Sequence, residues 1–314
     1  MSELTIQEHP AVSNPRLVLG LTGWMDGGSV STGTVSYLRD KLGATKFAEI
    51  EPLDFYIFHF PVSTVPVSVQ SAGGRLAITQ VDPMQFAAVF RPHTRIEDGS
   101  IQEFTCPRNE FLCSERSDLI LFSGEEPHVR WGAYCDCLFD LAEECGVKEF
   151  YFVGSVAGPV PHTREPRIRA SVPRQDLKER LGAAGVEFTN YEGPASLVTL
   201  LAHQSVDRGI EMRSLVVEIP HYPFLEMPTY PKSILKATSA LNTLLGLDLD
   251  LSDLRESSAK VDEKLDAVME DSDEFRELVA KLERAYDYEE SAAEEERLRR
   301  LIEMIDLGDD EGHS

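Results

Sequence analysis

The apolar residues of this chain form short runs, separated by segments in which apolar residues recur at helical spacing. A short apolar run indicates a buried strand, and spacings of three and four indicate a helix lying on a sheet. The second pattern follows the first glycine loop, where Val30, Val35 and Leu38 share one side of a helical wheel. The predicted strands are 16–20, 47–50, 54–60, 118–122, 149–153, 186–189 and 214–219, with a hairpin of 65–69 and 75–80.

Proline and glycine mark the ends of the predicted helices. Residues 131–145 form a helix closed by Gly146, and Pro231 opens a helix that stops at Gly246. Because strands and helices alternate from residue 118 onward, right-handed crossovers and parallel pairing are expected. The predicted fold class is α/β with a mainly parallel mixed sheet. Two further helices are expected at 173–185 and from Pro194 through Leu201.

The acidic C-terminal region differs in composition from the rest of the chain. Residues 252–314 hold 22 acidic and nine basic residues, and apolar positions from Leu254 to Tyr286 follow a four-three spacing. A capping signal at Asp271–Glu274 divides this stretch into two helices. These helices either fold back on the body or contact another subunit or partner. The expected organisation is a lead-in at 1–15, an α/β domain at 16–251 and an acidic helical extension at 252–314.

Composition excludes several classes of function. The 314 residues are 42% hydrophobic and carry a net charge of −24, which opposes binding to a phosphate backbone, so nucleic acid is not an expected partner. The first residues lack the features of a signal peptide and no apolar run approaches 18 residues, so we expect a cytoplasmic protein without membrane contact. Five cysteines give no disulfide framework, and no residue cluster has metal-ligand spacing.

Loops of small residues follow several predicted strands and converge at the carboxyl edge of a parallel sheet, where such folds bind ligands. The first loop contains Trp24, Asp26, Gly27, Gly28 and Ser29. Its backbone N–H groups are either an anion cradle at a helix start or part of an ordinary turn and cap. The loop lacks the nucleoside-triphosphate and dinucleotide fingerprints, so no cofactor is expected.

Acidic and hydroxyl side chains follow the next strands. Glu125, Glu126 and His128 offer a general acid or base, or they cap the following helix. Ser123 and Ser155 follow strands but lie outside the Gly-x-Ser-x-Gly elbow of esterases. The catalytic residues, if the chain is an enzyme, stay unassigned.

Basic side chains gather in a proline-rich loop. His162, Arg164, Arg167 and Arg169 either clamp a phosphate or carboxylate or form ion pairs within the molecule or between subunits. His203 lies on an apolar-rich helix and is expected in the core or at an interface. The complete set of pocket candidates is Trp24, Asp26, Gly27, Gly28, Ser29, Ser123, Glu126, Ser155, Arg164, Glu192 and His221.

These segments, taken in order, resemble the bacterial branch of the proteasome assembly chaperone family over roughly residues 14–247. The resemblance is carried by Gly23-Trp-Met-Asp-Gly-Gly28, by 118–127 with Trp131, by Val160-Pro-His-Thr-Arg164, by Tyr191-Glu-Gly-Pro194 and by His221-Tyr222. It implies a three-layer α/β/α domain similar to nucleoside phosphorylases, and a homo-oligomer with a trimer favoured. By this resemblance, the acidic extension after Leu251 is not part of the domain that members of this family share.

Two functional hypotheses follow. The first is a protein-interaction or assembly factor, favoured by the resemblance and by the acidic helices, through which a protein partner would bind. The second is a small-molecule enzyme or sensor that binds a nucleoside-like or phosphorylated ligand at the carboxyl edge. A fold shared with phosphorylases does not establish a reaction.

Overall fold

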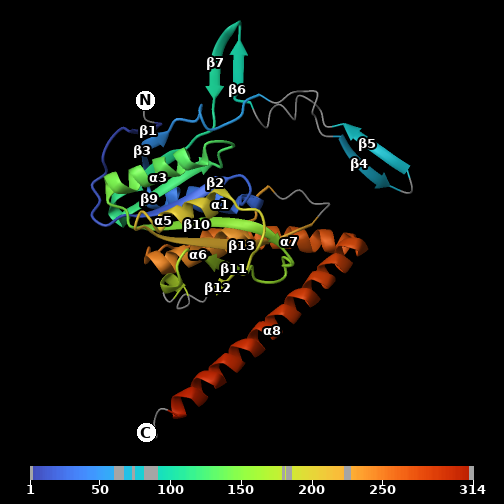
Figure 1. The fold of residues 1–314 in the computed structure, drawn as a ribbon. Helices are drawn as coiled ribbons and strands as arrows, with labels where there is room; N and C mark the ends of the chain where they lie inside the picture. The colour runs from blue at the N-terminus through green and yellow to red at the C-terminus, as the bar shows by residue number, and fades with distance from the viewer. Residues whose placement is uncertain are drawn as a thin grey trace.

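The computed structural model describes residues 3–59, 67–72, 75–80, 91–178, 181, 186–222 and 228–310, with backbone alone for 67–72, 75–80 and 293–310. Its centre is a nine-stranded sheet (Figure 1). In spatial order the strands are β1 (Leu4–Ile6), β3 (Thr45–Ile50), β8 (Glu110–Ser114), β9 (Leu119–Glu125), β2 (Arg16–Thr22), β10 (Glu149–Gly158), β13 (Glu211–Pro220), β11 (Ile168–Ser171) and β12 (Glu187–Phe188).

The parallel part of the sheet is its centre. Strands β9, β2, β10 and β13 are mutually parallel, whereas β8, β3 and β1 alternate in direction at one flank and β11 reverses direction at the other. The predicted α/β class with a mixed sheet is confirmed. The strand predicted at 186–189 is β12, which pairs in parallel with β11 and so runs opposite to the central strands.

Helices cover both faces of the sheet, because successive strand residues point to opposite sides. In β2, Leu17 and Leu19 pack in one core with α3 (Trp131–Cys145) and α5 (Leu197–Ser205). Val18 packs in the other core with α1 (Val30–Leu42) and α6 (Pro231–Leu245). The expected three layers are therefore present.

The ends of two helices lie where the terminal glycines predicted them. Helix α3 ends before Gly146, which has φ 73°, and α6 ends before Gly246, which has φ 62°. This left-handed conformation suits glycine, and the backbone N–H of each glycine bonds to a carbonyl of the last helical turn. Helix α5 begins at Leu197, later than the predicted start at Pro194.

Several predicted elements differ from the structure. The strand predicted at 54–60 is wrong for the described residues 54–59, because Phe55 donates its N–H to Pro52 in a turn (3.0 Å). Strands β1, β8 and β11 were not predicted. The helix predicted at 173–185 is described only in part, with a 3-10 turn η4 at Gln175–Leu177, while 179–180 and 182–185 lie outside the described residues.

Two antiparallel hairpins project from the body (Figure 1). The first, β4 (Val67–Ala72) with β5 (Arg75–Gln80), confirms the predicted hairpin, whose residues 65–66 lie outside the described ranges. The second, β6 (His93–Glu97) with β7 (Ser100–Thr105), was not predicted. Two further 3-10 turns are η1 (Gly27–Ser29) and η3 (Glu115–Ser117).

The acidic extension forms two helices, α7 (Ser252–Asp271) and α8 (Asp273–Asp310), as the capping signal predicted. Ser272 Oγ accepts the N–H of Phe275 at the start of α8 (3.2 Å). Leu254 of α7 joins the core beneath α1 and α6. A third apolar cluster joins the body to both helices through Tyr222, Tyr230, Leu265, Phe275 and Val279. Helix α7 and the first part of α8 therefore fold back on the body.

Candidate functional site

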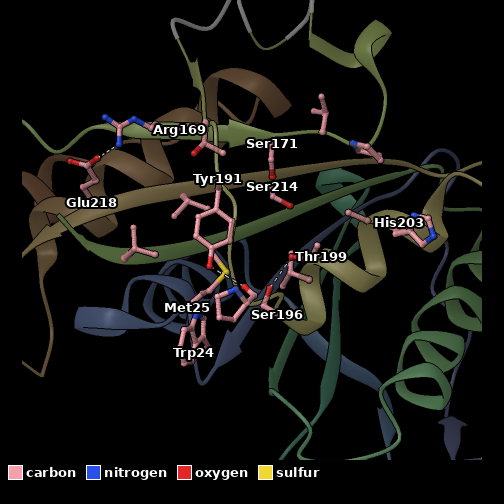
Figure 2. A pocket seen from close by; sticks show the side chains of 18 of the residues that line it. Trp24, Met25, Arg169, Ser171, Tyr191, Ser196, Thr199, His203, Ser214 and Glu218 are labelled. Carbon is pink, nitrogen blue, oxygen red and sulfur yellow. Dashed lines mark hydrogen bonds and ion pairs between the residues drawn. The ribbon is translucent and has the colours of Figure 1, made fainter. Parts of the chain in front are cut away.

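An elongated cavity of about 530 Å³ lies between α5 and the adjoining face of β13 and β11 (Figure 2). Alternate residues of β13 line it, because Ser214, Val216 and Glu218 face α5 while their neighbours face the opposite core. Trp24 and Tyr191 stand at the rim and are 72% and 68% exposed. The remaining wall is Met25, Val156, Arg169, Ser171, Val172, Pro173, Thr189, Pro194, Ser196, Val198, Thr199, Ala202, His203 and Val206.

The charged end of the cavity is neutralised within the protein. Glu218 is buried and forms an ion pair with Arg169. Burial raises the pKa of Glu218, and the neighbouring arginines oppose that shift. At the opposite end, His203 is exposed and lines the cavity, which corrects the first of the two expected places for it, the core, and leaves the second, an interface, as a prediction. Between these ends the wall is mostly apolar, as in sites that accept small ligands.

Glu126 holds the rim of the cavity together. Its Oε2 accepts the N–H of Trp24 (3.1 Å) and its Oε1 accepts the N–H of Leu197 (3.0 Å). The second bond satisfies one of the free N–H groups at the start of α5, where the helix dipole also favours a carboxylate. Glu126 therefore positions two rim segments. It caps a helix, but this helix is α5 and not the following helix α3, which the sequence pattern had suggested.

The first glycine loop forms the start of α1. Asp26 accepts the N–H of Thr32 with Oδ1 (3.1 Å) and the hydroxyl of Thr32 with Oδ2 (2.8 Å). Burial raises the pKa of Asp26, and the bonds from Thr32 oppose that shift. Ser155 donates to the carbonyl of Gly27 (2.6 Å), and Ser29 donates to the carbonyl of Pro228 (2.7 Å).

The two glycines of this loop lie against neighbouring chain. A Cβ on Gly27 would stand 2.7 Å from Cδ1 of Ile219, and one on Gly28 would stand 2.9 Å from Cβ of Tyr230. Gly28 also has φ 59°, which favours glycine. The loop therefore packs against the segments around Ile219 and Tyr230, as a turn and cap would.

The remaining candidates lie apart from the large cavity. Ser123 and Ser29 line a smaller hollow of about 360 Å³ beside α1. Glu192 and His221 are exposed and do not line the large cavity. Of the eleven predicted pocket residues, Trp24 alone lines it, and Glu126 supports its rim.

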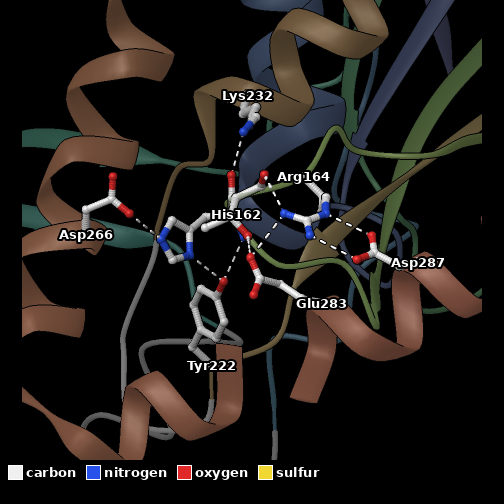
Figure 3. A network of polar contacts seen from close by, with 8 residues as sticks. His162, Arg164, Tyr222, Lys232, Asp266, Glu283 and Asp287 are labelled. Atoms are coloured by element: carbon white, nitrogen blue, oxygen red, sulfur yellow. Dashed lines mark hydrogen bonds and ion pairs between the residues drawn. The ribbon is translucent and has the colours of Figure 1, made fainter. Parts of the chain in front are cut away.

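Arg164 lies against α8 (Figure 3). Its Nε and Nη2 donate to the two carboxylate oxygens of Asp287 (2.9 and 3.0 Å), and its Nη1 donates to Glu283 (3.1 Å). The Asp287 carboxylate has a lowered pKa because of its bond to Arg164. Arg164 therefore forms ion pairs within the molecule, which is one of the alternatives that the sequence left open for it.

Arg167 connects α8 to the charged end of the cavity. It is buried, and it donates to Glu290 (2.8 Å), to Glu289 (2.9 Å) and to the carbonyl of Tyr286 (2.9 Å). Its guanidinium carbon lies 3.9 Å from the centre of the Tyr286 ring. Its Nη1 is also 3.6 Å from Oε2 of Glu218. A chain of charged contacts thus runs from the cavity wall to α8.

His162 takes part in the same contact between the body and the C-terminal helices, through both its ring face and its polar atoms. Its ring stacks on Phe275 of α8, with centroids 5.9 Å apart and planes at 11°. The Tyr222 hydroxyl accepts the backbone N–H of His162 (2.8 Å) and lies 2.7 Å from Nδ1. The Nε2 of His162 lies 3.1 Å from Oδ1 of Asp266 in α7.

Of the eighteen cavity residues that sequence reasoning missed, nine lie in β11, β13 and α5, Val156 lies in β10, and the others lie in the adjoining loops and helix ends. The alternation of Ser214, Val216 and Glu218 with the apolar residues Leu215, Val217 and Ile219 was the available signal. Among the described residues, no three histidines, cysteines or acidic residues are grouped to hold a metal ion. No helix in the described part of the chain is long and apolar enough to cross a membrane.

Comparison with known proteins identifies the family. The model of the PAC2 family matches residues 20–269, which contain the whole cavity and α7 up to its last turn. The chain belongs to the PAC2 family. The predicted resemblance is therefore confirmed, although no curated protein matches the sequence at a significant level. The match extends past the expected end at 247, which corrects the expectation that the extension from residue 252 departs from the family.

Solved structures share the fold. A PAC2 family protein from Streptomyces avermitilis is 25% identical, with a TM-score of 0.66 over 85% of this chain and 100% of that one. A Mycobacterium tuberculosis proteasome-assembly chaperone homologue is 22% identical, with a TM-score of 0.66 over 84% and 99%. PbaB of Pyrococcus furiosus, an archaeal proteasome activator, is 23% identical, with a TM-score of 0.58 over 85% and 99%.

Proposed function

We propose that this PAC2 protein is a protein-interaction or assembly factor that acts on proteasome-type subunits in the cytoplasm. The observation that carries the proposal is the family match over 20–269, together with a fold shared with a proteasome-assembly chaperone homologue and a proteasome activator. The exposed Trp24 and Tyr191 at the cavity rim support it, because exposed aromatic residues are common anchors in protein interfaces.

Assembly assays test this proposal. Proteasome α and β subunits from the same organism are expressed separately, mixed with and without this protein, and followed on native gels. We expect the protein to associate with subunits or intermediates and to change the rate at which rings form. Trp24→Ala with Tyr191→Ala should weaken that association, whereas Phe104→Ala on the distant β7 should not. The absence of any association or rate change would reject the proposal.

The cavity supports a second candidate, a sensor or enzyme for a small ligand. Its volume and mostly apolar wall suit a nucleoside-like molecule, whereas its Arg169 is already paired with Glu218. Thermal melting with nucleosides, nucleotides and inorganic phosphate as probes tests this candidate. A saturable rise in melting temperature that Val216→Trp abolishes would favour it, and a melting temperature independent of every probe would count against it.

We further propose that the protein forms a homo-oligomer, with a trimer favoured, and that the C-terminal helices contact a protein partner. The family resemblance supports the oligomer. The acidic surface of α7 and of the first part of α8 supports the contact, whereas Leu254, Leu265, Phe275 and Val279 of the four-three pattern are buried against the chain's own body.

A further inference from the structure

The junction of α7 and α8 is a hinge of one residue. Ser272 has extended backbone angles, φ −132° and ψ 109°, between two helices of 20 and 38 residues. Its hydroxyl caps α8 at Phe275, and Arg276 Nη2 donates to the carbonyls of Met269 (3.1 Å) and Glu270 (3.0 Å). These contacts satisfy backbone groups that a continuous helix would satisfy by itself.

The spacing of four and three continues where the helix breaks. It runs from Leu254 to Tyr286 with serines at two of its positions, Ser258 and the hinge residue Ser272, and Val268 and Phe275 on either side of the hinge keep the register. A strict alternation of this kind describes one side of a single helix. Val268, next to the hinge, is the member of this side that stays exposed. The sequence from 252 onward therefore fits both a hinged pair and one continuous helix.

We infer that α8 is exchanged between copies of this chain. When the hinge straightens, α7 and α8 form one helix, and α8 docks on residues 160–167 of a second copy. The second copy is the occupant because residues 160–167 of any copy are complementary to α8 of any other. Arg164 donates to both carboxylate oxygens of Asp287, and Phe275 packs on His162 and Tyr222. This inference goes beyond the proposed function and does not depend on it.

Exchange keeps every docking contact. The closed and the exchanged form differ only at the hinge, where the exchanged form gains a continuous helix, and in the translational and rotational freedom that the exchanged form loses on association. Because this loss depends on concentration, the protein concentration decides between the two forms. A short hinge favours exchange, and a longer one lets α8 return to its own body. Exchange from each copy to the next closes a ring, so it is compatible with two copies or three.

Charge reversal separates docking within a copy from docking between copies. Arg164→Asp and Asp287→Arg each place like charges where two hydrogen bonds now form. The two single variants are co-expressed, and hydrogen exchange of residues 275–290 is followed in the Asp287→Arg chain. Its peptides that contain residue 287 differ in mass from those of the Arg164→Asp chain, so the two chains are distinguished. We expect this segment to exchange about tenfold more slowly in the mixture than in Asp287→Arg alone. The double variant on one chain should exchange like the parent and controls for folding.

The hinge is tested in the same mixture. Inserting Gly-Ser-Gly-Ser after Ser272 in both chains should remove the slower exchange, because each α8 then returns to its own body. Replacing Ser272 and Arg276 with alanine should preserve it, because both contacts that hold the break are lost. Equal exchange in the mixture and in Asp287→Arg alone would overturn the inference. Slower exchange that survives the insertion would overturn the role of the hinge.

Discussion

At the scale of single residues, Glu126 joins two parts of the cavity rim that lie far apart in the sequence. It is the acceptor for the N–H groups of Trp24 and Leu197. Glu126→Ala should lower the free energy of unfolding by about 1–2 kcal/mol, since the start of α5 loses its cap. Urea denaturation measures this change, with the exposed Glu192→Ala as the control expected within about 0.5 kcal/mol of the parent. Equal effects of the two changes would contradict the capping role.

Arg167 is the residue on which α8 and the cavity both depend. Arg167→Ala should destabilise the protein by about 1–3 kcal/mol, because buried Glu218 loses a neighbouring cation and α8 loses three hydrogen bonds. Urea denaturation gives the loss, and hydrogen exchange of residues 283–290 should accelerate. Arg174→Ala removes an exposed pair with Asp176 and should change neither quantity. Unchanged exchange in Arg167→Ala would show that α8 docks without this residue.

At the scale of elements, the start of α7 contacts α1 through a carboxylate whose contribution to stability depends on pH. Asp253 accepts the hydroxyl of Tyr37 (2.6 Å) and pairs with Lys41 (2.9 Å), which lowers the pKa of this carboxyl to about 2 from 3.8. A lowered pKa gives stability that is complete above the unfolded value and is lost as the pH falls through the folded one.

The resulting prediction concerns the pH range between about 4 and 2. The melting temperature of the parent should exceed that of Asp253→Asn above this range, and the difference should shrink as the pH falls through the range and approach zero below pH 2. Thermal melts of both proteins in parallel at each pH cancel the titration of other groups. A difference that stays constant down to pH 2 would show that the contact makes no such contribution.

The elements that could be predicted are those specified by nearby residues. Helices α3 and α6 carry their own apolar side and a terminal glycine, and both ends were correct. Strand β11 was interpreted as part of a proline-rich loop that carries Arg164, Arg167 and Arg169, whereas Ile168 becomes part of a strand by pairing with Val217. The cavity was largely missed for the same reason, since its wall combines residues from 24 to 218 that only the tertiary fold brings together.

At the scale of the whole molecule, the extension is expected to be dispensable for the fold of the body. A chain ending at Leu251 should still unfold cooperatively. Its melting temperature should be lower, because Tyr222 and Tyr230 lose apolar neighbours and Arg164 and Arg167 lose their carboxylates. Calorimetry tests this expectation, and a truncated chain without a cooperative transition would place the extension within the core.

Self-association is the second prediction at this scale. Light scattering at micromolar concentration should give a mass three times the 35.0 kDa of one chain. A mass of one chain over the whole accessible concentration range would reject the proposed oligomer.

The position of β2 in the sheet also has a consequence for biosynthesis. This strand is made early, yet its parallel neighbours are β9, where Arg16 pairs with Leu119, and β10, where it pairs with Glu149. At roughly 5–20 residues per second, the ribosome delivers β9 about 5–20 s after β2. During that interval an apolar segment destined for the middle of the sheet has neither neighbour. Ribosome-bound fragments that end before residue 119 should therefore be the form of this protein most dependent on holding factors in the cell.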